Sequence, residues 1–399
     1  MTVSGNAAMR ILHCGKYFPP DRGGMETFLG DLAPAQAAAG HQVLVLANAG
    51  EVPAGRETPR PGLQVIRSRV AWTVGGYAPL APALPLHFLR AALGFRPEVL
   101  HLHAPNGAAF WLLLLGLGTP LVLHWHADVT FPPERRPPAA LLAAWTWLER
   151  RLLGRADAVV ATSPSYLASS PALAGFRDKC RVVPLGLADP AGGPEEEHPA
   201  VNFLRVAPGL KVLCVGRLSH YKGLAVLCAA AAQVPEVSLC LVGEGEERPA
   251  LEQAVARLGL GSRVLLAGGL SDAAKAACYA ACDVLCLPSL SRSEAFGLVL
   301  LEAMARGKPC VASAVDGGGP GYVVQDGETG LLVPPGDAAA LAAALRRLAG
   351  DGRLRARLGA AGRERFTDHF RIERVVAALD EVYAGARRRR HPLAAREEA

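Results

Sequence analysis

Short apolar runs alternate with longer amphipathic stretches along most of the chain. Runs of this kind are typical of strands buried on both faces, and the stretches between them are typical of helices that cover a parallel sheet. The pattern therefore predicts an α/β fold with two series of strands. The first series is residues 10–14, 42–47, 63–67, 99–103, 120–126, 157–162 and 181–185, and the second is residues 211–215, 237–242, 263–267, 283–288, 309–312 and 330–333.

Between the two series, residues 188–209 interrupt the pattern with prolines, glycines and three consecutive glutamates, which is typical of a linker. We therefore predict a Rossmann-like domain at 1–189, a linker at 190–209, a second Rossmann-like domain at 210–384 and a basic tail at 385–399. Two doubly wound parallel sheets are expected to face a central cleft, with the ligand at the carboxyl ends of their strands.

The composition fits a globular chain of two domains and argues against several other classes. The 399 residues are 51% hydrophobic and 20% charged, which is typical of folded soluble proteins. The net charge of +6 is modest, and much of it lies in the arginines at 387–390, so no nucleic-acid partner is indicated. The most apolar run, residues 107–123, is broken by glycines and a proline, so it predicts a helix and a strand rather than a transmembrane anchor.

The nine cysteines lie mostly inside apolar patterns, and no Cys-x-x-Cys pair occurs. Because no leader peptide is recognised ahead of them, we expect reduced thiols and a cytoplasmic location. Cys278, Cys282 and Cys286 are spaced by four residues, but they fall in a helix and a strand pattern, so packing is favoured over a metal site.

Two glutamates, Glu294 and Glu302, lie around the start of a helix predicted at 296–306, just after the strand at 283–288. The free backbone N–H groups at such a start suit a phosphate group. Ionised carboxylates only accept hydrogen bonds, which suits the hydroxyls of a sugar. Taken alone, both glutamates could equally be helix-end charges. The N–H groups that we assign to the phosphate are those of Phe296, Gly297 and Leu298.

The Glu-x7-Glu segment, with Phe-Gly-Leu inside it, resembles the signature of the retaining glycosyltransferases of family 4, which have the GT-B fold. The resemblance implies that the first domain binds the acceptor and the second binds a nucleotide diphosphate sugar. It also implies that Glu302 binds the ribose diol and Glu294 the hydroxyls of the transferred sugar. The helical stretch at about 363–384 resembles the family's last helix, which packs back on the first domain.

Two cations, Arg217 and Lys222, follow the strand at 211–215 in one loop. Alone, each could be a solvated loop charge. Together, a planar guanidinium and a compact ammonium suit a leaving diphosphate without a metal. No Asp-x-Asp pair occurs in the sequence, so we expect metal-independent chemistry without a cofactor. The resemblance assigns both cations to the donor diphosphate, and it places Gly243 and Gly245 in a turn beside the base.

In the first domain, Gly23 and Gly24 precede a helix expected near Met25, where backbone N–H groups can approach a phosphate or an acceptor. Most such pairs only mark turns, and no Gly-x-Gly-x-x-Gly fingerprint is present, so a nicotinamide enzyme is not indicated. The resemblance assigns this pair to a donor-side glycine loop. After the motif of the two glutamates, the run Gly317-Gly318-Gly319 departs from the pattern that is common in the family.

A histidine-rich turn, His124-Trp125-His126-Ala127-Asp128, follows another strand of the first domain. The resemblance matches His126 to the active-site histidine of the family. We expect strand alternation to point only one of His124 and His126 into the cleft. Asp128 is assigned to the acceptor side, either orienting His126 or binding the acceptor hydroxyl. Two further histidines, His101 and His103, are interpreted as packing residues.

These observations favour a retaining hexosyltransferase, with mannose as the preferred sugar, that acts on a glycan or lipid-linked acceptor in bacterial surface-polysaccharide or glycolipid synthesis. A front-face route is favoured over a Glu294 nucleophile. The alternatives are a non-catalytic glycan-binding protein and a nucleotide-sugar epimerase of similar fold. Oligomeric state is left open. The predicted catalytic residues are His126, Arg217, Lys222 and Glu294.

A cluster of arginines around an aromatic helix raises the question of a membrane surface. Trp145 and Trp147 lie in this helix, and the arginines are Arg135, Arg136, Arg150, Arg151 and Arg155. Such a helix could lie on an anionic membrane at the inner face of the plasma membrane, or it could be a solvated face with buried tryptophans.

Overall fold

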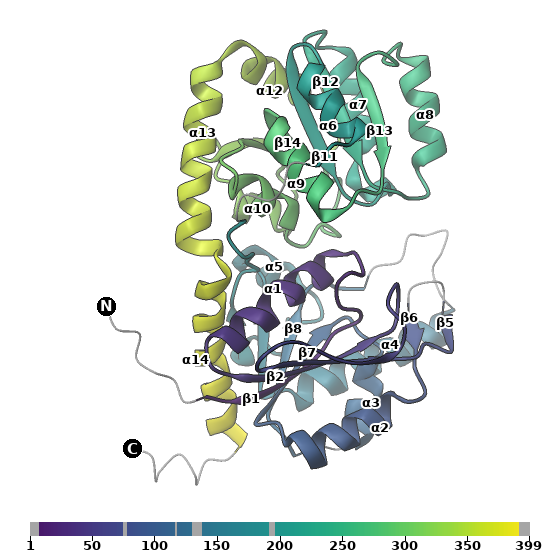
Figure 1. The fold of residues 1–399 in the computed structure, drawn as a ribbon, viewed down its shortest axis with the longest axis vertical. Helices are drawn as coiled ribbons and strands as arrows, with labels where there is room; N and C mark the ends of the chain where they lie inside the picture. The colour runs from purple at the N-terminus through teal and green to yellow at the C-terminus, as the bar shows by residue number, and fades with distance from the viewer. Residues whose placement is uncertain (1–7, 75–77, 116–117, 130–137, 191–195, 391–399) are drawn as a thin grey trace. The chain divides into compact units, whose positions relative to one another are not determined.

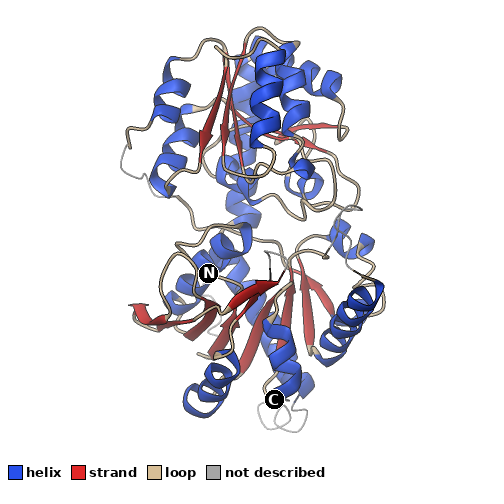
Figure 2. Ribbon diagram, turned by 90° about the vertical axis from the view of Figure 1, so that its right-hand side faces the viewer, coloured by secondary structure: helices blue, strands red, loops and turns tan. Residues whose placement is uncertain are grey.

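The computed structural model describes residues 8–74, 78–115, 118–129, 138–190 and 196–390. The chain divides into two compact units. The first unit is Met1–Ala188 together with Ile372–Ala399, and the second is Asp189–Arg371. Each unit is an open, mostly parallel sheet with helices on both faces (Figure 2).

The described strands of the first unit form an eight-stranded sheet in the order β10-β9-β8-β7-β1-β2-β4-β3. All neighbouring pairs are parallel except β3 with β4. The strand order reverses between β1 and β7, which is where open α/β sheets bind ligands. The strands are β1 (Arg10–Cys14), β2 (Gln42–Asn48), β3 (Gly55–Arg60), β4 (Leu63–Ser68), β7 (Val99–Ala104), β8 (Leu121–Trp125), β9 (Ala158–Ala161) and β10 (Cys180–Val182).

Helices cover this sheet, and a small hairpin of β5 (Trp72–Val74) and β6 (Ala78–Leu80) lies apart from it. The first helix, α1 (Gly24–Ala38), packs beside the last, α14 (Ile372–Arg390), although the two are at opposite ends of the chain (Figure 1). The other helical segments are α2 (Leu84–Arg90), η1 (Ala91–Phe95), α3 (Ala108–Leu115), α4 (Ala139–Arg155), α5 (Pro164–Ser169) and η3 (Arg177–Lys179).

The second unit contains a six-stranded parallel sheet in the order β13-β12-β11-β14-β15-β16. This is the strand order of a doubly wound nucleotide-binding fold, with its reversal between β11 and β14. The core on one face is formed by valines and leucines of the central strands against α7 and α12. The strands are β11 (Leu210–Val215), β12 (Val237–Val242), β13 (Val264–Gly268), β14 (Val284–Leu287), β15 (Cys310–Ser313) and β16 (Gly330–Val333).

Helical segments between β11 and β16 connect the parallel strands, α6 precedes the sheet, and α12, α13 and η5 follow it. The helical segments of the second unit are α6 (Pro199–Val206), η4 (His220–Lys222), α7 (Leu224–Ala232), α8 (Arg248–Arg257), α9 (Asp272–Ala281), α10 (Leu298–Met304), α11 (Pro320–Val323), α12 (Ala338–Gly350), α13 (Gly352–Arg365) and η5 (Phe366–Phe370).

The predicted linker at 190–209 is partly wrong, because residues 199–206 form the helix α6. This helix packs on α9, β12 and β13, so it belongs to the second unit. The division between units falls between Ala188 and Asp189. Asp189 is held by Arg363, whose guanidinium donates to both carboxylate oxygens at 2.7 Å.

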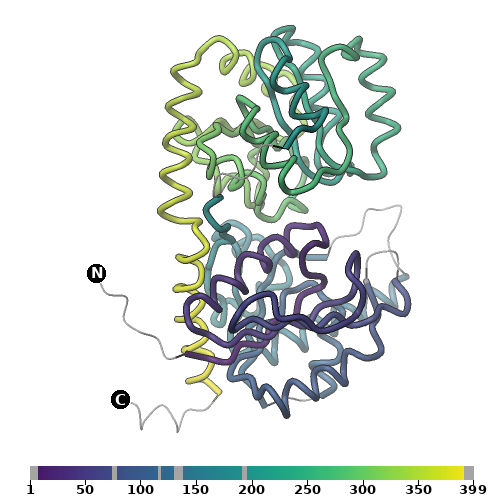
Figure 3. Tube along the Cα trace, in the orientation of Figure 1, coloured from purple at the N-terminus to yellow at the C-terminus, as the bar shows by residue number. Residues whose placement is uncertain are grey.

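The predicted last helix at 363–384 is two helices, because Arg371 has an extended backbone between η5 and α14. The return of the chain to the first unit is confirmed, since α14 packs on α1, β8 and β9, and its path can be followed in Figure 3. The arginines at 387–390 continue α14 rather than beginning a tail. One of them, Arg387, forms an ion pair of 3.3 Å with Glu98.

All nine cysteines are buried and unpaired, as the sequence predicts. Among the helices of the described residues, none is both long enough and apolar enough to cross a bilayer.

Candidate active site

A buried ion pair lies at the point where the strand order of the second unit reverses. Lys222 ends η4, just after β11, and Glu294 lies on the loop that follows β14. The Lys222 Nζ donates to the Glu294 Oε2 at 2.5 Å, and the Ser289 hydroxyl donates to the same oxygen at 3.1 Å. The structure therefore brings together two predicted site residues that are far apart in the sequence.

The electrostatics of this pair keep the lysine cationic. Burial is the largest single influence and lowers the pKa of Lys222, but the charge and hydrogen bond of Glu294, together with Tyr221 and Cys214, outweigh it, and the net pKa is raised. Both side chains are about one-tenth exposed, at 11% and 10%. A charge pair held this far from water acts strongly on any ligand charge placed beside it.

A glycine allows this close approach of the two strand ends. Gly223 follows Lys222 with φ +67°, and a Cβ atom on it would lie 2.1 Å from the carbonyl oxygen of Pro288. A side chain here would therefore separate the lysine from the Glu294 loop. Arg217, the other predicted cation, lies in the same loop after β11 with an exposed side chain.

Glu302 lies on α10 and is bound by two side chains of α9. The Lys275 Nζ donates to the Glu302 Oε1 at 3.1 Å, and the Tyr279 hydroxyl donates to Oε2. Burial, followed by the charge of Glu302, raises the pKa of Tyr279 well above its usual value. Glu302 is therefore not an exposed helix charge, and its remaining lone pairs can still accept from a diol.

The start of α10 is formed by Gly297, which is the N-cap residue with φ +88° and no side-chain cap. The preceding Phe296 is buried, and Leu298 is the first helical residue. The glycine run that departs from the family pattern supports this segment, because a Cβ on Gly319 would lie 2.2 Å from the Phe296 Cα. Gly319 is thus explained by close packing against the segment that follows Glu294.

Close backbone contacts at positions 243 and 245 explain why both residues are glycines. A Cβ on Gly243 would lie 1.9 Å from the Gly216 carbonyl oxygen, and one on Gly245 would lie 2.2 Å from that of Leu218. Both glycines therefore let the turn after β12 approach the loop that carries Arg217. Their assignment to the base stays a prediction.

In the first unit, the strands β1, β7 and β8 bring five histidines together around the point where its strand order reverses. All five are buried. The expectation that only one of His124 and His126 shares this face is wrong: their rings are stacked with centroids 4.4 Å apart. Residues two apart on a strand point to the same face. The cluster is His13, His101, His103, His124 and His126.

His126 is held by another histidine rather than by Asp128. Its Nε2 is hydrogen-bonded to the His103 Nδ1 at 3.0 Å, whereas the Asp128 carboxylate accepts from Trp125 Nε1 and Ser170 Oγ at 2.8 and 2.7 Å. The role of Asp128 on the acceptor side stays a prediction. Burial lowers the pKa of His126 to about 3, so its ring is neutral near pH 7.

The glycine pair of the first unit lies at the start of α1, with Gly23 as N-cap and Gly24 as first residue. A Cβ on Gly23 would lie 2.1 Å from a carboxylate oxygen of Glu26, which is buried in the first helical turn.

A carboxyl group that was not predicted as a site residue is Glu149 on α4. Burial raises its pKa to about 7, and the negative charge of Asp128 adds to the rise. A single acidic residue among the arginines of that helix is the signal that could have found it.

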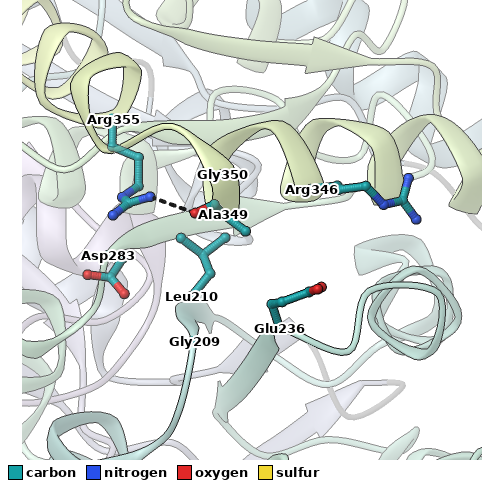
Figure 4. A pocket seen from close by; sticks show the side chains of 8 residues that line it. All are labelled: Gly209, Leu210, Glu236, Asp283, Arg346, Ala349, Gly350 and Arg355. Atoms are coloured by element: carbon teal, nitrogen blue, oxygen red, sulfur yellow. Dashed lines mark hydrogen bonds between the residues drawn. The ribbon is translucent and has the colours of Figure 1, made fainter.

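The second unit also has a cavity of about 470 Å³ at the opposite end of its strands from Lys222 and Glu294 (Figure 4). Gly209 and Leu210, at the amino end of β11, line it together with Asp283, Arg346 and Arg355. Ligands of open parallel sheets bind at the carboxyl ends of the strands, so this cavity is not part of the site of Lys222 and Glu294.

Family models match both units of the chain. The model "Glycosyl transferase 4-like domain" matches residues 23–186, and "Glycosyl transferases group 1" matches residues 203–365. The D-rhamnosyltransferase WbpZ of Pseudomonas aeruginosa is 32% identical over 345 residues, covering 85% of this chain and 86% of the relative. The phosphatidyl-myo-inositol mannosyltransferase of Mycobacterium leprae is 34% identical over 367 residues, covering 86% and 88%.

Solved structures agree with this assignment. The sucrose-phosphate synthase of Thermosynechococcus elongatus has a TM-score of 0.78 and 29% identity, covering 94% of this chain and 98% of that one. HepE of Anabaena, in complex with UDP-glucose, has a TM-score of 0.71 and 25% identity, covering 94% and 99%. Two Rossmann-like units and this signature define a glycosyltransferase of the GT-B fold. The chain belongs to the group 1 glycosyltransferases with a family 4-like N-terminal domain.

Proposed function

We propose that this glycosyltransferase moves a hexose from a nucleotide diphosphate sugar to a hydroxyl of a glycan or lipid-linked acceptor, with retention of the anomeric configuration. The observation that carries the proposal is the buried Lys222–Glu294 pair at the switch point of the second unit, 2.5 Å between Nζ and Oε2. The lysine is a fixed cation for the diphosphate, and the carboxylate accepts hydrogen bonds from sugar hydroxyls.

The other residues of the second unit complete this donor site. Arg217 adds a second cation from the same loop, so that charge developing on the leaving diphosphate is stabilised without a metal. Glu302, held by α9, accepts from the ribose diol. The N–H groups of Phe296, Gly297 and Leu298 supply further donors to phosphate, and the turn at Gly243 and Gly245 lies beside the base.

Residues of the first unit contact the acceptor and the donor. Because the ring of His126 is neutral near pH 7, it contributes a hydrogen bond rather than a proton. The leaving phosphate then accepts the proton of the acceptor hydroxyl, and Glu294 forms no covalent bond. Gly23 and Gly24 let the backbone at the start of α1 approach the donor, and Asp128 stays on the acceptor side.

Mannose is the sugar that we favour, since a relative of 34% identity is named a mannosyltransferase that acts with phosphatidyl-myo-inositol. A nucleotide-linked donor is supported by the solved complex of HepE with UDP-glucose. The work of such an enzyme belongs to cell-surface polysaccharide or glycolipid synthesis on the cytoplasmic side.

Purified protein incubated with a panel of nucleotide sugars and bacterial glycan or lipid acceptors should release nucleotide in an acceptor-dependent way. Product mass identifies the sugar, and the NMR coupling of the new anomeric proton reports retention. Donor conversion to a new sugar without any acceptor would instead indicate an epimerase. If no pairing of donor and acceptor releases nucleotide, the proposal is overturned. A glycosyl–Glu294 adduct in mass spectra would overturn the front-face route.

We further propose that α3 and α4 rest on an anionic membrane surface. Phe110, Leu114, Leu141 and Trp147 are 50–66% exposed on these helices, and the Arg151 guanidinium lies 5.4 Å from the centroid of the Trp147 ring. Large apolar side chains beside arginines suit the headgroup boundary. The predicted contributions of Arg135 and Arg136 lie outside the described residues.

Co-sedimentation with vesicles that contain anionic lipid checks this surface. Trp147→Ser is expected to weaken binding about tenfold, because partial burial of an indole contributes on the order of 1–2 kcal/mol. Trp72→Ser is the matched control, since Trp72 is equally exposed, at 58%, on the β5–β6 hairpin. Equal loss in both variants, or binding unaffected by salt and by lipid charge, would contradict the proposal.

A further inference from the structure

The core of the first unit contains an unusual number of polar ring atoms. Five buried histidines from β1, β7 and β8 meet Gln36 of α1 and Tyr383 of α14, and each of these two side chains is fully buried. Nothing in the proposed transfer reaction uses any of them except His126. A buried polar group without a partner costs about 1–3 kcal/mol, so the arrangement of their protons decides whether the cluster is stable.

Four of these side chains form one hydrogen-bonded chain. The His13 Nε2 is bonded to the Gln36 Oε1 at 2.7 Å, and the His13 Nδ1 to the His103 Nε2 at 3.1 Å. The His103 Nδ1 is bonded to the His126 Nε2 at 3.0 Å. The chain therefore leads from the interior of α1 to the residue that follows the carboxyl end of β8.

The ring separations show how the rings meet. In the two bonded pairs, His13–His103 and His103–His126, the centroids are 5.3 Å apart. The pair His124–His126, whose rings face each other, has centroids 4.4 Å apart at an angle of 11°. The bonded rings are thus joined through their edges, with one proton between each pair of nitrogens.

The end of the chain at Gln36 fixes where these protons lie. The amide oxygen only accepts, so the His13 Nε2 carries the hydrogen. A neutral ring has one N–H, so the His13 Nδ1 accepts from the His103 Nε2, and by the same step the His103 Nδ1 accepts from the His126 Nε2. The amide nitrogen of Gln36 donates to the Tyr383 hydroxyl at 2.9 Å, which leaves the hydroxyl hydrogen for the His101 Nδ1 at 2.7 Å.

We propose that Gln36 is a positioning residue that sets the tautomer of His126 through His13 and His103, so that the His126 Nδ1 presents a lone pair to a ligand hydroxyl. Since the Nε2 of His126 is occupied by His103, Nδ1 is the ring nitrogen that remains for a ligand. Because its Nε2–H already donates to His103, His126 can only accept from a ligand, and a hydroxyl of the sugar or the acceptor must donate to it. This last step rests on the proposed function, whereas the tautomer itself does not.

A metal ion is the rival occupant of the cluster. The ring nitrogens of His13, His101 and His103 lie within 4.8 Å of one another, and so do those of His103, His124 and His126. An ion lies in the plane of each imidazole that binds it, but the ring of His124 is stacked face to face on His126. In the structure the two short contacts, at 3.0 and 3.1 Å, are instead assigned to N–H···N hydrogen bonds, and bound zinc is one outcome of the test.

The tautomers can be measured directly on the full chain labelled with ¹⁵N-histidine. Long-range ¹H–¹⁵N correlation at pH 7.5 distinguishes a ring that carries its proton on Nε2 from one that carries it on Nδ1, and His126→Gln assigns the signals of His126. The expected result for the wild type is the Nε2–H form of His13, His103 and His126. An Nδ1–H form of His126, or one equivalent of bound zinc, would overturn the proposal.

Variants test the transmission along the chain. Gln36→Leu removes the acceptor, and because a buried orphan N–H is costlier than an orphan lone pair, the three rings should change together to the Nδ1–H form. Gln36→Glu keeps an acceptor for His13 and should retain the wild-type tautomer of His126. In a His103→Phe background, Gln36→Leu should no longer affect His126. A folded Gln36→Leu variant with an unchanged His126 tautomer would contradict the proposal.

Activity gives a second readout that a merely structural residue would not produce. With an active donor and acceptor pair, Gln36→Leu should lower kcat about tenfold, the worth of one hydrogen bond, while the donor KM stays unchanged and Gln36→Glu restores the rate. If no donor is turned over at all, the proposed function fails, but the NMR result still decides the tautomer chain. A parallel loss in Gln36→Leu and Gln36→Glu would argue for packing instead.

Discussion

Replacing the buried lysine, in Lys222→Met, is expected to lower kcat/KM by about 10²–10³, the usual effect of removing one preorganised group that stabilises transition-state charge. The same change should destabilise the second unit by about 3–5 kcal/mol, because it leaves the Glu294 carboxylate buried without its cation. The Ser289 hydroxyl, which donates to the same oxygen at 3.1 Å, would remain but carries no charge. Steady-state kinetics and urea unfolding measure the two effects separately.

A double variant separates catalysis from stability. In Lys222→Met/Glu294→Gln no charge is left buried, so most of the lost stability should return, whereas activity should stay low because neither group is available to the donor. Arg346→Ala is the control: this exposed arginine of the second unit donates to the Gln233 carbonyl at 2.9 Å and should leave kcat/KM unchanged. Recovery of activity together with stability in the double variant would show that the pair is only structural.

The fold of the second unit could be predicted well because its strands are almost purely apolar. Each run of the second series overlaps one strand of the sheet, with ends that agree to within one residue. The pattern did not predict β3 of the first unit. This strand is exposed at every position, so its sequence contains no apolar run. The helix α6 was missed for another reason. Its proline and its surroundings resemble a linker, and its packing on α9, β12 and β13 is what shows that it belongs to the unit.

The site was predictable in part. The residues Lys222 and Glu294 could be assigned to one region, because parallel strands end at the same edge, but their direct contact depends on the tight approach that Gly223 allows. The histidine cluster carried a clear signal that was misread. Two His-x-His pairs, at 101–103 and 124–126, place both members on one face, and the register pairs His103 with His124.

The histidine cluster should make the first unit sensitive to mild acid. Burial lowers the pKa of His13 to about 4 and of His126 to about 3, and burial lowers the pKa of the other three well below the usual 6.5. In the unfolded chain each ring takes up a proton below pH 6.5, while the folded rings stay neutral, so stability is present above pH 6.5 and is lost as the pH falls towards 4. Each such ring costs about 1.4 kcal/mol per pH unit in this window.

Five rings together give a slope of up to about 7 kcal/mol per pH unit, which is comparable to the whole stability of a domain, so the first unit should unfold between about pH 5 and 6. All five tryptophans lie in this unit, at 72, 111, 125, 145 and 147, so their fluorescence in urea titrations at pH 7.5, 6.5 and 5.5 reports it selectively.

A single ring can be removed to check the cause. His124→Phe keeps an aromatic ring in the stack and deletes two buried nitrogens that have no hydrogen-bond partner within the described residues. It should cost little at pH 7.5 and should reduce the slope below pH 6.5 by about 1.4 kcal/mol per pH unit, which is one proton. His369→Gln, an exposed residue of the second unit, is the control. If His124→Phe has the wild-type slope, the acid sensitivity does not come from the cluster. Removing one ring of the cluster must remove the one proton that this ring takes up on unfolding.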